Sequence, residues 1–162
     1  DDMAVIAEDL GFITPTVEQL VKDSGFPNMK VLQFAFDSRE ESNYLPHTYG
    51  KNCVVYTGTH DNDTTLGWFK VLSKDDKNMA VKYADLKGVK LCDTTWKFIR
   101  LAMLSVADTC IIPMQDYLGL GSEARMNTPS TLGGNWQWRI SQNVLTEDRC
   151  NWIRKLAYIY RR

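Results

Sequence analysis

The sequence predicts an α/β fold with a parallel sheet. Short apolar segments typical of buried strands recur along the chain, and segments with helical spacing fill most of the gaps between them. Parallel strands need long crossover connections, usually helices, so this alternation favours a parallel sheet. With 162 residues, of which 44% are hydrophobic, the chain can form one domain with a core. The pattern fits either a small open sheet or half of an eight-stranded barrel.

The first elements have clear boundary signals. We expect the first strand at residues 4–7. A helix should follow with Thr14 as its N-cap and Pro15 at its first position, because these residue types favour those places. The second strand is expected at residues 29–36, a nearly continuous apolar run of the kind found in strands buried on both faces.

The remaining strands are separated by helical segments. Residues 37–52 are polar and irregular and are predicted to form a long loop, a feature that is often functional in compact domains. The third strand is expected at residues 53–57 and the fourth at residues 109–113. Helices are expected at residues 66–72, 77–86, 93–106 and about 147–160.

Composition excludes several classes of function. The net charge is −1 and the basic residues form no stripe, so nucleic acid is not expected as a partner. No apolar run approaches about 18 residues, so no membrane span is expected. The four cysteines show no C-x-x-C spacing, which argues against a zinc knuckle or redox pair. Buried thiols fit a reducing compartment, and the cytoplasm is the expected location.

Acidic residues follow two of the predicted strands. His60 and Asp61 come directly after the third strand, and Glu8 and Asp9 come after the first. In parallel sheets and α/β barrels, the carboxyl ends of the strands carry the chemistry. Two acids from separate strands suggest glycosidic-bond chemistry, which needs a proton donor and a second carboxylate. The alternative is that these acids cap turns and helices.

Glu8 and Asp9 are neighbours at a strand end, so only one of them can face a cleft above the sheet. Glu8 follows the apolar sequence Val-Ile-Ala. An apolar environment disfavours the charged form of a carboxyl, which suits a general acid. The alternative role for both acids is to accept hydrogen bonds from loop amides.

Two other groups of residues allow further interpretations. His60, Asp61 and Asp63 are potential metal ligands, although no other His or Cys lies near them in the sequence. Trp136 and Trp138 alternate with polar residues. They suit stacking on sugar rings, and a half-buried hairpin or flap explains them equally well.

Five motifs in a fixed order resemble the C-terminal part of the 4-α-glucanotransferases, also called amylomaltases or disproportionating enzymes, of the α-amylase clan. The motifs are residues 6–11, 29–36, 59–64, 112–116 and 124–129. The resemblance implies that residues 1–162 form a single partial domain. It would be the C-terminal half, about four parallel strands, of a (β/α)₈ TIM barrel.

The same resemblance implies roles for individual residues. Glu8 would be the general acid/base, and Asp61 would hold substrate hydroxyls and stabilise the transition state. His60 would share the grip on those hydroxyls, while Asn127 and Phe34 would line sugar subsites. The family resemblance implies neither a metal nor a cofactor.

The activity implied is transfer of α-1,4-glucan segments between maltosaccharides, with glucose as an acceptor, by a retaining double displacement. The resemblance places the nucleophile in an Arg-x-Asp motif on an earlier strand, and the sequence contains no Arg-x-Asp. We therefore expect a missing N-terminal half of the barrel and an inactive isolated chain. The rival hypotheses are a non-catalytic α-glucan-binding module and a metal-dependent hydrolase.

Overall fold

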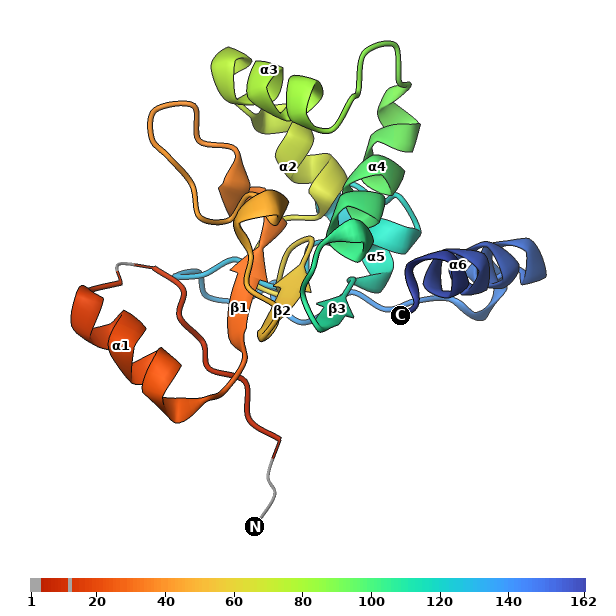
Figure 1. Cartoon of the computed structure of the whole chain (residues 1–162). Helices are drawn as coiled ribbons and strands as arrows, with labels where there is room; N and C mark the ends of the chain where they lie inside the picture. Colours follow the sequence, from red (N-terminus) through yellow and green to blue (C-terminus); the bar gives the residue numbers. More distant parts are fainter. Residues whose placement is uncertain (1–3, 12) are drawn as a thin grey trace.

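A computed structural model describes residues 4–11 and 13–162, and it contains a parallel sheet with helices around it (Figure 1). The described strands are β1 (Asn28–Val31), β2 (Cys53–Tyr56) and β3 (Thr109–Ile111). Their order is β1-β2-β3, and both pairs are parallel. The α/β class and the parallel sheet are therefore confirmed. The carboxyl ends of all three strands meet at one edge of the sheet.

The expected strand at residues 4–7 is not confirmed in the described chain, which has only an isolated bridge there. Only Ala7 pairs with the sheet, through a single parallel bridge to Asn28. Its N–H donates to the carbonyl of Pro27 at 2.9 Å. Val5 and Ile6 are 36% and 44% exposed, so neither face of this segment is covered as it would be in an inner strand.

The expected strand at residues 29–36 is correct only in its first part. Strand β1 ends at Val31, and the chain then forms a 3₁₀ turn, η1 (Leu32–Ala35). A 3₁₀ turn brings residues three apart to the same side, so Leu32 and Ala35 are both buried while Phe34 is exposed. An apolar run alone cannot distinguish a strand from a buried helical turn.

Helix α1 (Pro15–Ser24) has the ends that the sequence predicts. The Val17 N–H donates to the Thr14 hydroxyl at 3.4 Å, and Gly25 ends the helix with a left-handed φ of 69°. Helix α1 lies beside the β1 edge of the sheet (Figure 1) and has no fully buried residue.

The other helices lie above the sheet in Figure 1 or on its β3 side. They are α2 (Thr65–Val71), α3 (Lys74–Tyr83), α4 (Leu91–Leu104), α5 (Met114–Tyr117) and α6 (Glu147–Tyr160), with single 3₁₀ turns at η2 (Pro46–Thr48), η3 (Ser122–Ala124) and η4 (Gln142–Val144). Helix α3 begins three residues earlier than expected because Ser73 caps it, its hydroxyl accepting from the Asp76 N–H at 3.2 Å. The short helix α5 was not predicted.

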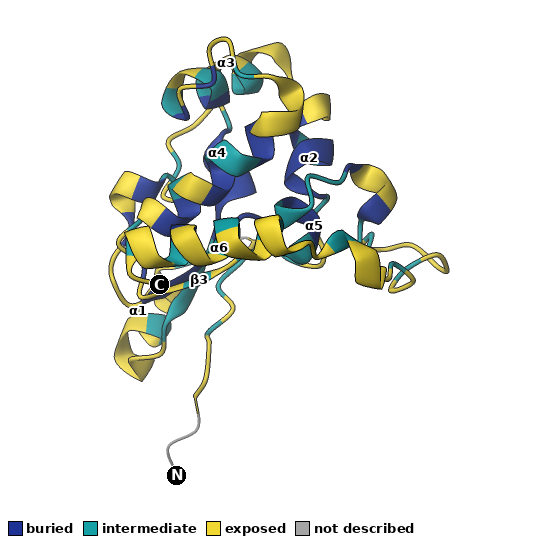
Figure 2. Ribbon diagram, turned by 90° about the vertical axis from the view of Figure 1, so that its right-hand side faces the viewer, coloured by how far each residue is buried: buried dark blue, intermediate teal, exposed yellow. Residues whose placement is uncertain are grey.

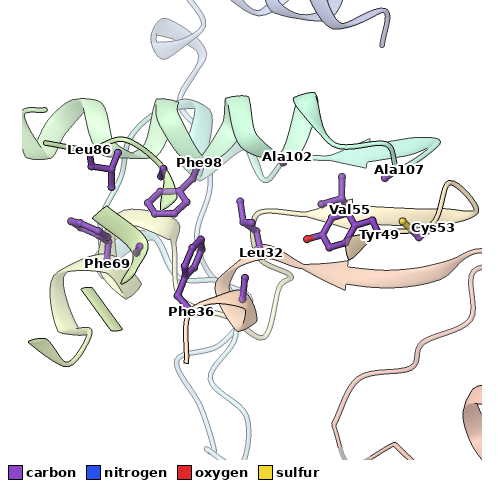
Figure 3. Close-up of a cluster of buried hydrophobic side chains, with 13 residues drawn as sticks. Leu32, Phe36, Tyr49, Cys53, Val55, Phe69, Leu86, Phe98, Ala102 and Ala107 are labelled. Carbon is purple, nitrogen blue, oxygen red and sulfur yellow. The ribbon is translucent and has the colours of Figure 1, made fainter. Parts of the chain in front are cut away.

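The core lies between the sheet and helices α2 and α4. Phe98 of α4 is 1% exposed, and its ring centroid lies 5.3–5.9 Å from those of Phe36, Trp68 and Phe69. Figure 3 shows Phe98 among the core side chains between α4 and the sheet. The buried residues concentrate on α2 and α4, whereas α6 is largely exposed (Figure 2). No helix in residues 4–11 and 13–162 is long and apolar enough to cross a membrane.

Candidate active site

Glu8, His60 and Asp61 line one pocket of about 270 Å³ at the carboxyl ends of the strands. Glu8 follows the Ala7 bridge, and the other two follow strand β2. The remaining wall is formed by Leu10, Met29, Tyr56, Gly58, Thr59, Ile111 and Pro113. The structure therefore brings together two acids and a histidine from separate segments, as the sequence analysis expected.

Asp61 is held by residues from a distant loop. Its Oδ1 accepts from Asn127 Nδ2 at 2.6 Å, and His60 Nε2 lies 3.3 Å from the same oxygen. Arg125 Nη2 donates to the Asp61 carbonyl at 2.7 Å. The Asp61 side chain is 49% exposed, so its carboxylate remains available to a ligand.

The backbone of the loop that carries Arg125 and Asn127 is also hydrogen-bonded to the segment of His60 and Asp61. The Asn127 N–H donates to the His60 carbonyl at 3.0 Å, and Arg125 Nε donates to the Asn127 carbonyl at 2.8 Å. These bonds place the Asn127 amide beside the acid that the sequence separates from it by 66 residues. Asn127 therefore belongs to the site through its hydrogen bond to Asp61, although it does not line the pocket itself.

Glu8 and Asp9 have different surroundings. The Asp9 carboxylate accepts from Asn28 Nδ2 at 2.8 Å and from the Met29 N–H at 2.9 Å, so Asp9 anchors the chain to β1. Glu8 is exposed and lines the pocket. The preceding Val5 and Ile6 are exposed, so the apolar residues near Glu8 are those that line its pocket, Leu10, Met29 and Ile111 among them.

Phe34 lies apart from this pocket. It is 42% exposed, packs edge-on against Tyr44 with ring centroids 5.5 Å apart, and lines a neighbouring pocket of about 500 Å³. Leu10 lines both pockets. The structure therefore does not bring Phe34 into contact with Asp61, although the two pockets share a wall.

Trp136 contacts the site directly, a contact that sequence reasoning did not predict. Its ring centroid lies 5.1 Å from that of His60, with an angle of 36° between the planes. Trp136 has a left-handed φ of 63°, an uncommon conformation for a bulky residue, and its N–H donates to the Met126 carbonyl at 2.7 Å. Trp138 has no comparable contact with His60 among the described aromatic pairs.

The carboxylates of Asp61 and Asp63 have separate partners. Asp63 Oδ2 accepts from the Ser122 hydroxyl at 2.6 Å, and its Oδ1 accepts from the Thr64 N–H at 2.7 Å. In the part of the chain that the structure describes, no group of three His, Cys, Asp or Glu side chains is arranged to hold a metal. The geometry does not support the metal-dependent alternative.

Asp116 is a buried acid for which sequence reasoning found no role. It is 1% exposed and accepts three hydrogen bonds, all from Thr57 and Thr65. Burial raises the pKa of the Asp116 carboxyl, and the hydrogen bonds from the two threonines oppose that rise. Its place in the motif at residues 112–116 was the only signal.

The comparison with known proteins identifies a family. A family model described as 4-alpha-glucanotransferase, glycoside hydrolase family 77, matches residues 1–146. The 4-alpha-glucanotransferase of Clostridium butyricum is 51% identical over 162 residues, covering 99% of this chain and 33% of the relative. The chloroplastic/amyloplastic 4-alpha-glucanotransferase of Arabidopsis thaliana is 48% identical over 161 residues, covering 98% of this chain and 28% of the relative.

A solved structure shows the same relationship. The amylomaltase from Streptococcus agalactiae in complex with acarbose is 39% identical, with a TM-score of 0.91, over 99% of this chain and 32% of that one. The chain thus spans about a third of the length of the curated relatives and of the amylomaltase structure that it matches. On the match of residues 1–146 to its model, the chain belongs to the 4-alpha-glucanotransferase family, glycoside hydrolase family 77.

Proposed function

We propose that this chain supplies the general acid/base and the transition-state-stabilising carboxylate of a 4-α-glucanotransferase. The observation that carries the proposal is the shared pocket of Glu8 and Asp61 at the carboxyl ends of parallel strands. The substrates would be α-1,4-glucans and maltosaccharides, with glucose among the acceptors. The names of the relatives favour this transferase over a glucan-binding module without catalysis.

The proposed reaction is a retaining double displacement. Glu8 protonates the glycosidic oxygen of the leaving group and then takes a proton from the acceptor hydroxyl. Asp61 accepts hydrogen bonds from sugar hydroxyls and places negative charge near the oxocarbenium-like transition state. His60 and Asn127 hold Asp61 and present N–H groups to the same sugar.

The nucleophile belongs to another part of the enzyme in this proposal. The sequence contains no Arg-x-Asp, the pattern in which the family resemblance places it. Retaining chemistry requires a nucleophilic carboxylate about 5 Å from the acid/base. The chain would therefore form its active site together with a preceding half-barrel.

The proposed architecture follows from the sheet. Residues 1–162 would form a single partial domain, the C-terminal half of a (β/α)₈ barrel. Support comes from the parallel order β1-β2-β3 and from the Ala7–Asn28 bridge, which continues that order by one position. In the complete barrel, residues 4–7 would pair on both sides and become the fourth strand.

We also place the protein in the cytoplasm. Cys53, Cys92, Cys110 and Cys150 are free thiols, as expected in a reducing compartment. The Arabidopsis relative is named chloroplastic/amyloplastic, so the family is not confined to one compartment.

A chimera tests the proposal. The aligned third of the C. butyricum enzyme would be replaced by this chain, which is 51% identical to it. We expect the chimera to convert maltotriose into glucose and longer maltosaccharides, and Glu8→Gln to abolish this conversion. Glu18→Gln, on the exposed helix α1, is the matched control. A folded chimera without transfer activity, or an active Glu8→Gln variant, would refute the proposed function.

A further inference from the structure

We propose that Asp116 is a positioning residue that fixes the loop of residues 58–64 and thereby places Asp61 for the reaction. The inference rests on the proposed function for its catalytic consequence. The structural part of it stands on the contacts of Asp116 alone. Asp116 does not line the pocket of Glu8 and Asp61; it lines a neighbouring pocket with His60, and its hydrogen bonds go to the two ends of the loop.

The Asp116 carboxylate connects both ends of this loop. Its Oδ2 accepts from the Thr57 hydroxyl at 2.5 Å and from the Thr65 hydroxyl at 2.7 Å, and its Oδ1 accepts from the Thr65 N–H at 2.8 Å. Thr57 follows strand β2, and Thr65 is the first residue of helix α2. One buried side chain of α5 therefore sets the separation between the end of a strand and the beginning of a helix.

The middle of the loop is attached from two other directions. Gln33 Nε2 donates to the Asp63 carbonyl at 2.8 Å, and Ser122 donates to the Asp63 carboxylate. A Cβ on Gly58 would lie 2.5 Å from Gln33 Nε2, so a side chain at this position would have to displace the Gln33 amide. With both ends and one side fixed, the exposed residues His60 and Asp61 project from a rigid base.

The chemistry of the contact explains why a carboxylate stands here. The Thr65 N–H can only donate, and it donates to Oδ1 of Asp116. The hydroxyls of Thr57 and Thr65 both donate to Oδ2, so the side chain at this position must offer two acceptor atoms to three donors. An asparagine with its oxygen against the Thr65 N–H would turn its NH₂ group toward the two hydroxyls, which would then accept and leave their own hydrogens without the acceptor that they have here. Burial disfavours the charged form of this carboxyl, and the three donors offset that cost.

Hydrogen exchange of the 162-residue chain tests the structural part. In Asp116→Asn, we expect amides of residues 57–65 to exchange about tenfold faster, while those of helix α3 stay within about twofold, because only the loop loses its anchor. Thr65→Val removes one donor and should give a smaller increase in the exchange rate of residues 57–65. Thr95→Val is the matched control. Thr95 is a fully buried threonine whose hydroxyl has no partner among the described residues.

The result must be local to support the inference. Unchanged exchange at residues 57–65 in both Asp116→Asn and Thr65→Val would overturn it. Equal acceleration over the loop and helix α3 would also overturn it, because that pattern means general destabilisation. If Asp116→Asn does not fold, Thr65→Val decides the question, since it keeps the Asp116 carboxyl and two of its three donors.

A double-mutant cycle in the chimera tests the catalytic part. Asp116→Asn should lower kcat about 10–100-fold with KM within about threefold, since displacing a catalytic group by about 1 Å has effects of this size. In an Asp61→Asn background, the same change should lower kcat by less than about twofold, because both variants remove the same contribution. Fully multiplicative effects would overturn the inference. An inactive unaltered chimera would refute the proposed function, and the exchange experiment would still decide the role of Asp116.

Discussion

Removing the amide of Asn127 should reduce transfer about tenfold. The bond from Asn127 Nδ2 to Asp61 Oδ1 is short, at 2.6 Å, and its acceptor is a carboxylate. Hydrogen bonds to charged groups contribute about 1.5–3 kcal/mol. Because Asp61 is 49% exposed, solvent replaces part of the lost bond, and the lower limit applies. About 1.4 kcal/mol corresponds to a factor of ten in kcat/KM.

Asn127→Ala would be measured in the chimera by initial rates of glucose release from maltotriose. Alanine retains the N–H that donates to the His60 carbonyl, so the backbone contact between the two loops should persist. Asn52→Ala is the matched control. Asn52 is exposed, and its Nδ2 donates to the neutral Gly25 carbonyl at 3.0 Å, away from the pocket of Glu8 and Asp61.

The reasoning would be refuted by an effect on kcat/KM of less than about twofold, or by an equal loss in Asn52→Ala. A small effect would mean that water orients Asp61 as well as Asn127 does. Asn127→Asp should be more damaging than Asn127→Ala, because it places a second carboxylate beside the first.

Three further predictions follow from the proposed site and from the sheet. In the chimera, Glu8→Gln should slow the first step of transfer far less with a glycosyl fluoride donor than with maltotriose, because fluoride leaves without protonation. Equal losses on both donors would exclude Glu8 as the acid. The isolated 162-residue chain should show no disproportionation of maltotriose by product chromatography, since loss of a nucleophile costs many orders of magnitude; clear product would require a different nucleophile. Light scattering of that chain at micromolar concentration should detect dimers or larger assemblies. The reason is that residues 4–7 and strand β3 leave the two edges of the sheet unpaired, and Ile111 of β3 is 41% exposed. A stable monomer would contradict the half-barrel architecture.

Local signals in the sequence predicted most helices well. Thr14, Pro15 and Gly25 define α1 because each has a physical preference for its position at a helix end. Helix α6 was expected at about residues 147–160 and is observed at Glu147–Tyr160. Helix α5 has only four residues, which is too short for a helical period to be recognised.

The strands were harder to predict because pairing depends on neighbours distant in the sequence. Residues 4–7 have the composition of a strand, yet they pair through one bridge in the described chain. Residues 32–35 are as apolar as the strand before them, but there the chain turns and the Gln33 N–H donates to the Thr57 carbonyl at 3.3 Å. Composition identifies apolar segments and does not supply their partners.

The site was predictable to the extent that it follows strand ends. His60 and Asp61 directly follow β2, and the rule for parallel sheets places them at the same edge as Glu8. The contact of Trp136 with His60 and the bonds of Asp116 join residues far apart in the sequence. No local pattern encodes such contacts, and the catalytic roles remain predictions for the experiments above.

The long sequence separation of the Asp116 contacts has a consequence during protein synthesis. Thr57 and Asp116 are 59 residues apart, so at about 5–20 residues per second the ribosome needs about 3–12 s to add the acid after the threonine. During that interval strands β1 and β2 can pair, while the loop of residues 58–64 lacks its anchor. The nascent chain can thus pair its first two strands before its reactive loop is anchored.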